Sequence, residues 1–228
     1  MKHTLLIKDW LSSFLSLLFP RCCVVCDRPL AKGEECICTV CNINLPRTNY
    51  HLRKDNPVER LFWGQIPLER ATSFFFYEKG SDFRLILHRL KYGGQKEIGA
   101  IMGRYMAAEL LSSHFFQGID VIIPIPLHKK KQQIRGYNQS EWIARGITAV
   151  TGIPIDTESI LRKKNTETQT HKSILETSGV MWKASLNFNA PEVLSRGNHI
   201  LIVDDVLTTG STTLACASCP GECGRNTD

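Results

Sequence analysis

The sequence predicts an α/β protein in which helices cover both faces of a parallel β-sheet. Short, continuous apolar runs rich in β-branched residues, DVIIPI at residues 120–125 and HILIV at residues 199–203, are typical of strands buried on both faces. Apolar residues at helical spacing predict helices at residues 82–92, 97–112 and 139–150. Strands and helices that alternate in this way favour a parallel sheet.

The composition is that of an ordinary globular protein. With 228 residues, 43% hydrophobic and 22% charged, the chain is long enough for one domain and a small appendage. No stretch approaches the ~20 apolar residues that a membrane helix needs. The apolar run at residues 10–19 has no small-residue cleavage site before Pro20, so it does not match a secretion signal. We therefore expect a cytoplasmic protein without membrane insertion.

Three regions of the chain differ in composition. Residues 1–20 are expected to form an amphipathic helix, because apolar side chains recur there at three-to-four spacing. Residues 21–46 are rich in cysteine and poor in large apolar residues, so a bound ion would have to substitute for a core. Residues 47–228 carry the alternating strands and helices. Two further elements are expected within them, a strand at residues 71–77 and a long exposed loop at residues 161–178.

Paired cysteines predict a metal site in the second region. Six of the nine cysteines lie between residues 22 and 41, where two C-x-x-C pairs occur. Clustered thiols in a cytoplasmic protein hold a metal more often than they form disulfides, and two such pairs complete the tetrahedral site that structural Zn²⁺ prefers. Disulfides or an iron–sulfur centre are the alternatives, and Cys22 or Cys36 could replace a neighbouring ligand. The expected ligands are Cys23, Cys26, Cys38 and Cys41.

The residues after the second strand predict an anion-binding loop. A buried parallel strand delivers the chain to the carboxyl edge of the sheet, where ligands bind. Asp204 and Asp205 place two carboxylate acceptors there, which suits a vicinal diol such as that of ribose. Small residues then let backbone N–H groups surround an anion ahead of a helix. These residues are Thr208, Thr209, Gly210, Ser211 and Thr212. The alternative is that the aspartates end a strand and the threonines cap a helix.

A basic stretch follows the first strand and is expected at the same edge of the sheet. Residues 121–183 hold ten Lys or Arg against five Asp or Glu. Within them, Lys129 is suited to point-charge attraction of a pyrophosphate and Arg135 to bidentate contact. A solvated basic turn is the alternative. Lys91 and Tyr92 either line the same cleft or end a surface helix.

Four segments resemble the ComF family of competence proteins. VDDVLTTGST at residues 203–212 is similar to the phosphoribosyl pyrophosphate loop of type I phosphoribosyltransferases. The resemblance covers roughly residues 22–213. The segments that narrow it to ComF are LHRLKYGG at residues 87–94, IPIPLHKKKQQIRGYNQSEWIA at residues 123–144 and LRKKNTETQTHKS at residues 161–173.

The resemblance implies a type I phosphoribosyltransferase-like domain at residues 47–228, preceded by a double zinc-ribbon-like module at residues 21–46. Asp204 and Asp205 would hold the ribose hydroxyls and residues 208–212 the 5′-phosphate, with Mg²⁺ on the pyrophosphate of phosphoribosyl pyrophosphate. Two functions follow. The protein either transfers a phosphoribosyl group to a nitrogen nucleophile, or is a non-catalytic zinc-containing protein of DNA uptake that holds a helicase partner or single-stranded DNA. No catalytic residue is assigned.

The sequence departs from the family pattern in two places. The family usually has an Arg and then an Asn shortly after the Gln-Thr segment, whereas here Glu176 is followed by TSGVMW. The family also continues beyond the phosphate loop with a full helix and another strand, whereas this chain runs into CASCPGECGRNTD. We therefore expect a C-terminally truncated domain without its last strand. Cys216, Cys219 and Cys223 are then unrelated to the metal site.

Overall fold

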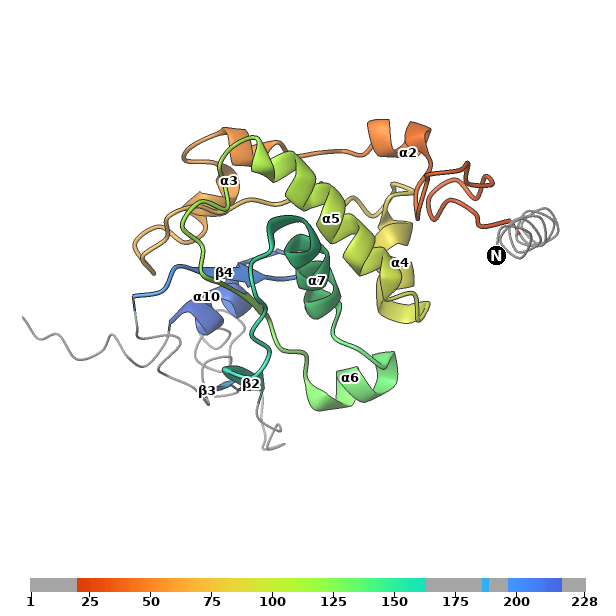
Figure 1. The fold of residues 1–228 in the computed structure, drawn as a ribbon. Helices are drawn as coiled ribbons and strands as arrows, with labels where there is room; N and C mark the ends of the chain where they lie inside the picture. Colours follow the sequence, from red (N-terminus) through yellow and green to blue (C-terminus); the bar gives the residue numbers. More distant parts are fainter. Residues whose placement is uncertain (1–19, 163–185, 189–196, 219–228) are drawn as a thin grey trace, which may run out of the picture.

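Helices and short strands alternate along the chain (Figure 1). The computed structural model describes residues 20–162, 186–188 and 197–218. The helix predicted before residue 20, the predicted loop beyond residue 162 with Glu176, and the end of the chain with Cys219 and Cys223 lie outside these ranges. Among the residues described, no helix is long and apolar enough to span a membrane.

A parallel two-stranded sheet lies at the centre of the fold. It consists of β1 (Val121–Pro124) and β4 (Ile200–Val203). Their register places Pro124 beside Val203, so both strands end at the same edge. Ile155 adds a parallel bridge to β1 on the side away from β4. Both strands and their parallel pairing were predicted from the sequence, and the structure confirms them.

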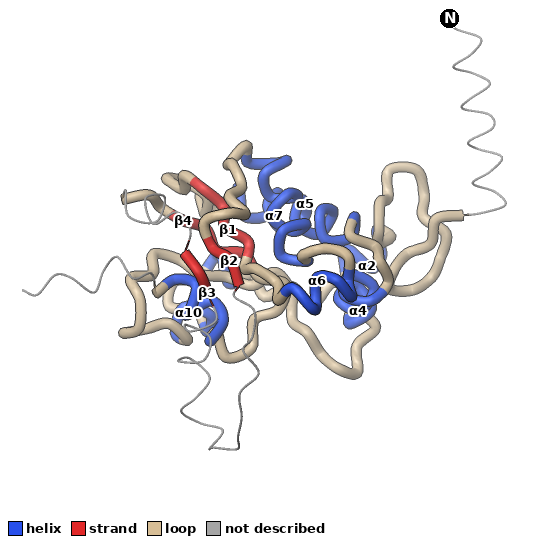
Figure 2. The backbone as a smooth tube through the Cα atoms, turned by 90° about the horizontal axis from the view of Figure 1, so that it is seen from below, coloured by secondary structure: helices blue, strands red, loops and turns tan. Residues whose placement is uncertain are grey.

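Different helices cover the two faces of this sheet (Figures 1 and 2). Ile122 packs in a cluster with α5 (Glu97–Leu111) and α7 (Gln139–Thr151), whereas the next residue, Ile123, packs in a cluster with α10 (Ser211–Ala217). Side chains alternate between the faces of a strand, so a strand covered on both sides is apolar throughout. The same alternation holds along β4, where Leu201 and Val203 join the first cluster and Ile200 and Ile202 join the second.

Glycines allow α5 and α7 to cross at close range. A Cβ atom at Gly103 would overlap the carbonyl oxygen of Ile143, and one at Gly146 would overlap the carbonyl oxygen of Ala100. Either clash would involve backbone, which cannot rotate away as a flexible side chain can. The crossing therefore depends on the absence of side chains at these positions. Both helices were predicted from the sequence, and Gly152 caps the end of α7.

Several short elements differ from the predictions. No helix was predicted in the basic stretch, but part of it forms α6 (Lys129–Arg135); this helix buries no residue, so it has no apolar periodicity to detect. α2 (Thr39–Ile43) and α3 (Pro57–Arg60) are also too short for a periodic signal. The start of the predicted loop at residues 161–178 lies instead in a strand. That strand, β2 (Ile160–Arg162), pairs antiparallel with β3 (Leu186–Phe188).

Residues 71–77 do not form the predicted strand. Only Phe75 makes a β-bridge, antiparallel to Arg47. On either side of this bridge, Thr48 N–H donates to the carbonyl of Phe74 and Phe76 N–H donates to the carbonyl of Pro46. Proline has no N–H to donate, so the pairing cannot extend regularly past it.

The cysteine-rich region packs on the main body of the protein. Buried side chains from residues 23–45 share one hydrophobic cluster with Ile86 of α4 (Arg84–Tyr92) and with Ile98 and Met102 of α5. Arg104 of α5 pairs with Glu35 of this region at 2.5 Å, and just beyond the region Arg47 pairs with Glu109 of α5 at 2.6 Å. The region thus contributes to a shared core.

The close crossing of α5 and α7 gives a stability prediction. Gly146→Ala should lower the free energy of unfolding by about 1–3 kcal/mol, because the added methyl forces the helices apart. Helix propensity alone would favour alanine by about 1 kcal/mol, so a net loss isolates the clash. Gly80→Ala is the control, since nothing lies within 4 Å of its Cβ position. Chemical denaturation measures both variants, and equal midpoints for the two would contradict the close crossing.

Candidate functional site

Three elements meet at two aspartates that follow β4. Asp204 Oδ1 accepts hydrogen bonds from Ser140 Oγ of α7 at 3.1 Å and from the backbone N–H of Asp205 at 2.8 Å. Asp205 Oδ2 forms an ion pair with Lys91 Nζ, at the end of α4, at 3.1 Å. The sequence predicted the aspartates as ligand acceptors at the carboxyl edge of the sheet, and the structure adds a cation and a hydroxyl that hold them.

Burial beside a second carboxylate weakens the acidity of Asp204. Burial raises the pKa of the Asp204 carboxyl, and the charge of Asp205 raises it further. The hydrogen bonds from Asp205 N–H and Ser140, together with the charge of Lys91, offset this only in part, so the pKa is about 6. Carboxyl groups with such a shift are concentrated at functional sites.

The predicted phosphate loop is a turn that leads into α10. Gly210 precedes the helix with a φ of 73°, a conformation that favours glycine, and it offers no side chain to cap the helix. The hydroxyls of Thr209 and Ser211 lie 2.8 Å apart in a hydrogen bond. Thr208 and Thr209 are exposed, and Ser211 and Thr212 form the first turn, whose N–H groups have no partner within the helix.

Phe62 supports this loop and was missed by sequence reasoning. A Cβ atom at Gly210 would lie 2.9 Å from the Phe62 ring, which is itself only 3% exposed. Gly210 is therefore required for space as well as for its backbone conformation. Phe62 follows α3, whose start is fixed by a capping box between Asn56 and Glu59. No motif in the sequence marks this aromatic residue as a neighbour of the loop.

The two cations predicted to bind pyrophosphate, Arg135 and Lys129, have different surroundings in the structure. Arg135 donates to Gln139 Oε1 at 2.9 Å, and its guanidinium lies over the Tyr92 ring at 5.5 Å. Tyr92 and Lys91 line the same cavity, so Arg135 lies close to the cavity beside Lys91. Lys129 is exposed at the first position of α6, and in the described part of the chain no hydrogen bond or ion pair joins it to the loop.

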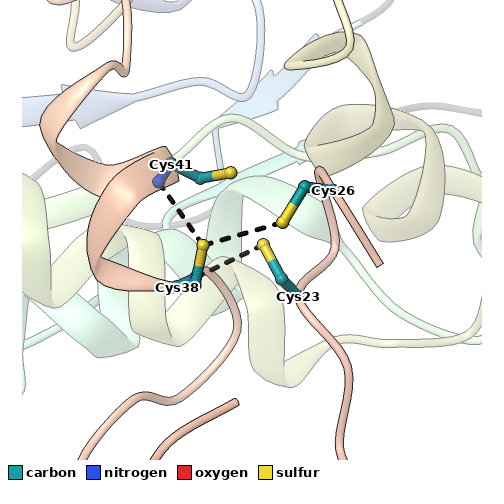
Figure 3. Close-up of side chains that lie close together, drawn as sticks. All are labelled: Cys23, Cys26, Cys38 and Cys41. Atoms are coloured by element: carbon teal, nitrogen blue, oxygen red, sulfur yellow. Dashed lines mark hydrogen bonds between the residues drawn. The ribbon is translucent and has the colours of Figure 1, made fainter. Parts of the chain in front are cut away.

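Four cysteines form a separate cluster (Figure 3). Their sulfur atoms all lie within 4.8 Å of one another, and the sulfurs of Cys26 and Cys38 are 3.7 Å apart. A Zn–S bond of about 2.3 Å places the sulfurs of a tetrahedral site about 3.8 Å apart, so the cluster fits such an ion. The four thiols could therefore hold a metal such as zinc. The cluster consists of Cys23, Cys26, Cys38 and Cys41.

Backbone N–H groups stabilise sulfur charge in this cluster. Cys38 N–H donates to Cys23 Sγ at 3.3 Å, and Cys41 N–H donates to Cys38 Sγ at 3.4 Å. Burial opposes ionisation of Cys23, but the backbone donors outweigh it and lower the pKa of its thiol to about 7. The thiolate is the form that binds metals. Cys22 and Cys36 lie outside the cluster, and burial raises the pKa of the Cys36 thiol to about 12.

Comparison with known proteins identifies the family. The chain is 30% identical over 216 residues to DNA utilization protein YhgH of Escherichia coli O157:H7, covering 88% of this chain and 91% of the relative. It is 26% identical over 221 residues to competence protein ComFC of Bacillus subtilis strain 168, covering 95% and 84%. Competence protein F of Haemophilus influenzae is 31% identical over 132 residues, covering 56% and 57%.

No family model matches the chain, and no solved structure matches it significantly. The match to the Escherichia coli relative spans nearly the whole of both proteins. The chain therefore belongs to the ComF family, as the four sequence segments indicated.

Because the pKa of Asp204 is raised, we expect replacement of this residue to increase the free energy of unfolding by an amount that depends on pH. Its folded-state value of about 6 lies above the ordinary value of 3.8, so its charge destabilises the fold above pH 6 and not below about pH 4, where both states are protonated. Asp204→Asn should therefore stabilise the free protein near neutral pH, by at most about 3 kcal/mol. Thermal melting across this range measures the gain.

The exposed Asp82 provides the control, because Asp82→Asn removes one charge without changing a buried group. A gain in Asp204→Asn that has the same size at both ends of the pH range would show that charge burial is not its cause.

Proposed function

We propose that the chain binds phosphoribosyl pyrophosphate, with Mg²⁺ on the pyrophosphate, at the turn between β4 and α10. One observation carries the proposal: Asp204 and Asp205 follow a parallel strand covered on both faces and, two residues later, a hydroxyl-rich turn leads into a helix. Ligands of open α/β sheets bind at this edge. The main domain would then have the type I phosphoribosyltransferase-like fold that the loop sequence resembles.

The chemistry of the turn supports separate roles for its two halves. A ribose diol offers two hydroxyl donors, which match the acceptor oxygens of Asp204 and Asp205. The turn at residues 208–212 offers hydroxyls and the unpaired N–H groups of a helix start, which match a phosphate. Arg135 lies near Lys91 and would face the pyrophosphate. Lys129 is assigned to the same pyrophosphate because of its charge alone. The pyrophosphate oxygens suit Mg²⁺, a hard cation that prefers oxygen ligands.

We also propose that the cysteine cluster holds a structural Zn²⁺. Four thiol ligands leave no open position, which is the arrangement of structural zinc sites. The surrounding residues share their hydrophobic cluster with α4 and α5, so the ion would fix this region against the main body. The division of the chain into residues 1–20, 21–46 and 47–228 belongs to the same proposal.

Metal analysis tests the zinc proposal. The purified protein should contain about one zinc per chain. Cys26→Ser should abolish zinc binding, and because Cys26 is exposed its replacement leaves no buried cavity. Cys22→Ser is the matched control, since the Cys22 thiol points to the carbonyl of Pro20, outside the cluster. Full zinc content in Cys26→Ser, or none in wild-type protein prepared without chelators, would exclude the four-cysteine site.

Calorimetric titration tests the ligand proposal. Replacing Asp204 and Asp205 together with Asn keeps the shape but removes the charged acceptors. Hydrogen bonds to charged groups are worth about 1.5–3 kcal/mol each, so affinity for phosphoribosyl pyrophosphate should fall by about tenfold or more. A 2,3-dideoxy analogue has no diol and should lose less. Asp82→Asn should bind as the wild type does. In a sample that melts cooperatively, unchanged affinity of the double variant would refute the assignment.

A second candidate function is a role in DNA uptake. The names of the relatives favour it, since they include DNA utilization protein and competence protein. In that role the chain would bind its ligand without consuming it and hold a helicase partner or single-stranded DNA. Release of pyrophosphate distinguishes the two candidate functions. A transferase releases pyrophosphate from the ligand when a nitrogen nucleophile is added, whereas a binding protein leaves the ligand intact.

A further inference from the structure

The backbone that carries Lys91 is fixed at the end of α4. The preceding residue, Leu90, is 1% exposed, and its carbonyl accepts a hydrogen bond from the Tyr137 hydroxyl at 2.5 Å. Leu87, Leu90 and Tyr137 form one cluster with the partly buried Val206, which follows the aspartates. This cluster ties the last turn of α4 to the aspartate turn. The four-carbon side chain of Lys91 can therefore reorient while its backbone is held in place.

The ammonium of Lys91 has more donors than Asp205 uses. Lys91 Nζ lies 3.1 Å from Asp205 Oδ2, and the two side chains are 22% and 15% exposed. An ammonium has three N–H donors, so it can keep one carboxylate contact and still reach a second acceptor. In a site this poorly solvated, an anion is the acceptor that best matches the remaining charge.

The space beside Lys91 can receive such an anion. A cavity of about 600 Å³, within the range of small-molecule sites, lies next to it. Arg84 and His88 of α4 also line this cavity, and Arg135 lies over the ring of a further lining residue, Tyr92. Basic side chains therefore line a cavity that adjoins Lys91, the residue that pairs with Asp205.

We propose that Lys91 is a further ligand-binding residue, which neutralises Asp205 in the free protein and contacts the pyrophosphate once phosphoribosyl pyrophosphate is bound. This inference rests on the proposed function. When the ribose hydroxyls donate to Asp205, the Lys91 ammonium is no longer the carboxylate's sole source of stabilisation. The ammonium can then also donate a hydrogen bond to the pyrophosphate. The site consequently distinguishes ligands that carry a pyrophosphate from ligands that carry only the 5′-phosphate.

Two variants of Lys91 distinguish the effect of its charge from the effect of the aliphatic part of its side chain. Lys91→Met keeps an unbranched stem without the charge, whereas Lys91→Arg keeps the charge. Lys96→Met is the matched control, because the Lys96 ammonium lies over the Trp142 ring at 4.7 Å rather than at Asp205. Each protein is titrated calorimetrically with phosphoribosyl pyrophosphate and with ribose 5-phosphate in the presence of Mg²⁺, after thermal melting has shown that it is folded.

Lys91→Met should lose about tenfold or more in affinity for phosphoribosyl pyrophosphate, and about twofold or less for ribose 5-phosphate. Lys91→Arg should recover most of that loss, and Lys96→Met should match the wild type. Equal losses for both ligands would overturn the inference, because Lys91 would then act only through Asp205. Unchanged binding by Lys91→Met would also overturn it while leaving the proposed function intact, whereas a wild type that binds neither ligand would overturn both.

Discussion

The parallel pairing of β1 with β4 determines where the other elements of the fold can lie. Its register places Pro124 beside Val203, so both strands release the chain at one edge of the sheet. The aspartates leave β4 at this edge, and the chain leaving β1 passes through α6 into α7, which returns Ser140 to Asp204. The continuous apolar faces of the two strands then fix α5 and α7 on one side and α10 on the other. The geometry of the aspartate turn follows from this packing.

Two aspartates of the fold show how placement distinguishes a structural carboxylate from one at a candidate site. Burial opposes ionisation of Asp156, but hydrogen bonds from the Ser159 hydroxyl and from the N–H groups of Ser159 and Glu158 outweigh it and lower the pKa of its carboxyl. Burial also opposes ionisation of Asp204, and there the adjacent charge of Asp205 prevents the same compensation. A turn selected for stability alone has no reason to place two carboxylates side by side where water is scarce. Ligand binding supplies a reason, because a diol would donate to both.

The sequence predicted the structure correctly where a local pattern determines it, but not where a contact between distant residues determines it. Continuous apolar runs predicted β1 and β4, and paired C-x-x-C spacing predicted a cluster of four cysteines that the structure brings together. The contact of Lys91 with Asp205 joins segments far apart in the chain, and the packing of Phe62 on Gly210 involves a residue without a motif. The strand predicted at residues 71–77 failed because its partner segment contains a proline. The helix α6 was missed because it buries nothing.

The two candidate sites are connected through α4. Ile86 of this helix packs in the hydrophobic cluster of the cysteine-rich region, and Arg89 pairs with Asp27 of that region at 3.6 Å. The next residue, Leu90, belongs to the cluster that includes Val206, and Lys91 after it pairs with Asp205. The nine residues of α4 therefore contact both the cysteine-rich region and the aspartate turn. The position of the Lys91 ammonium and the packing of the cysteine-rich region both depend on where this helix lies.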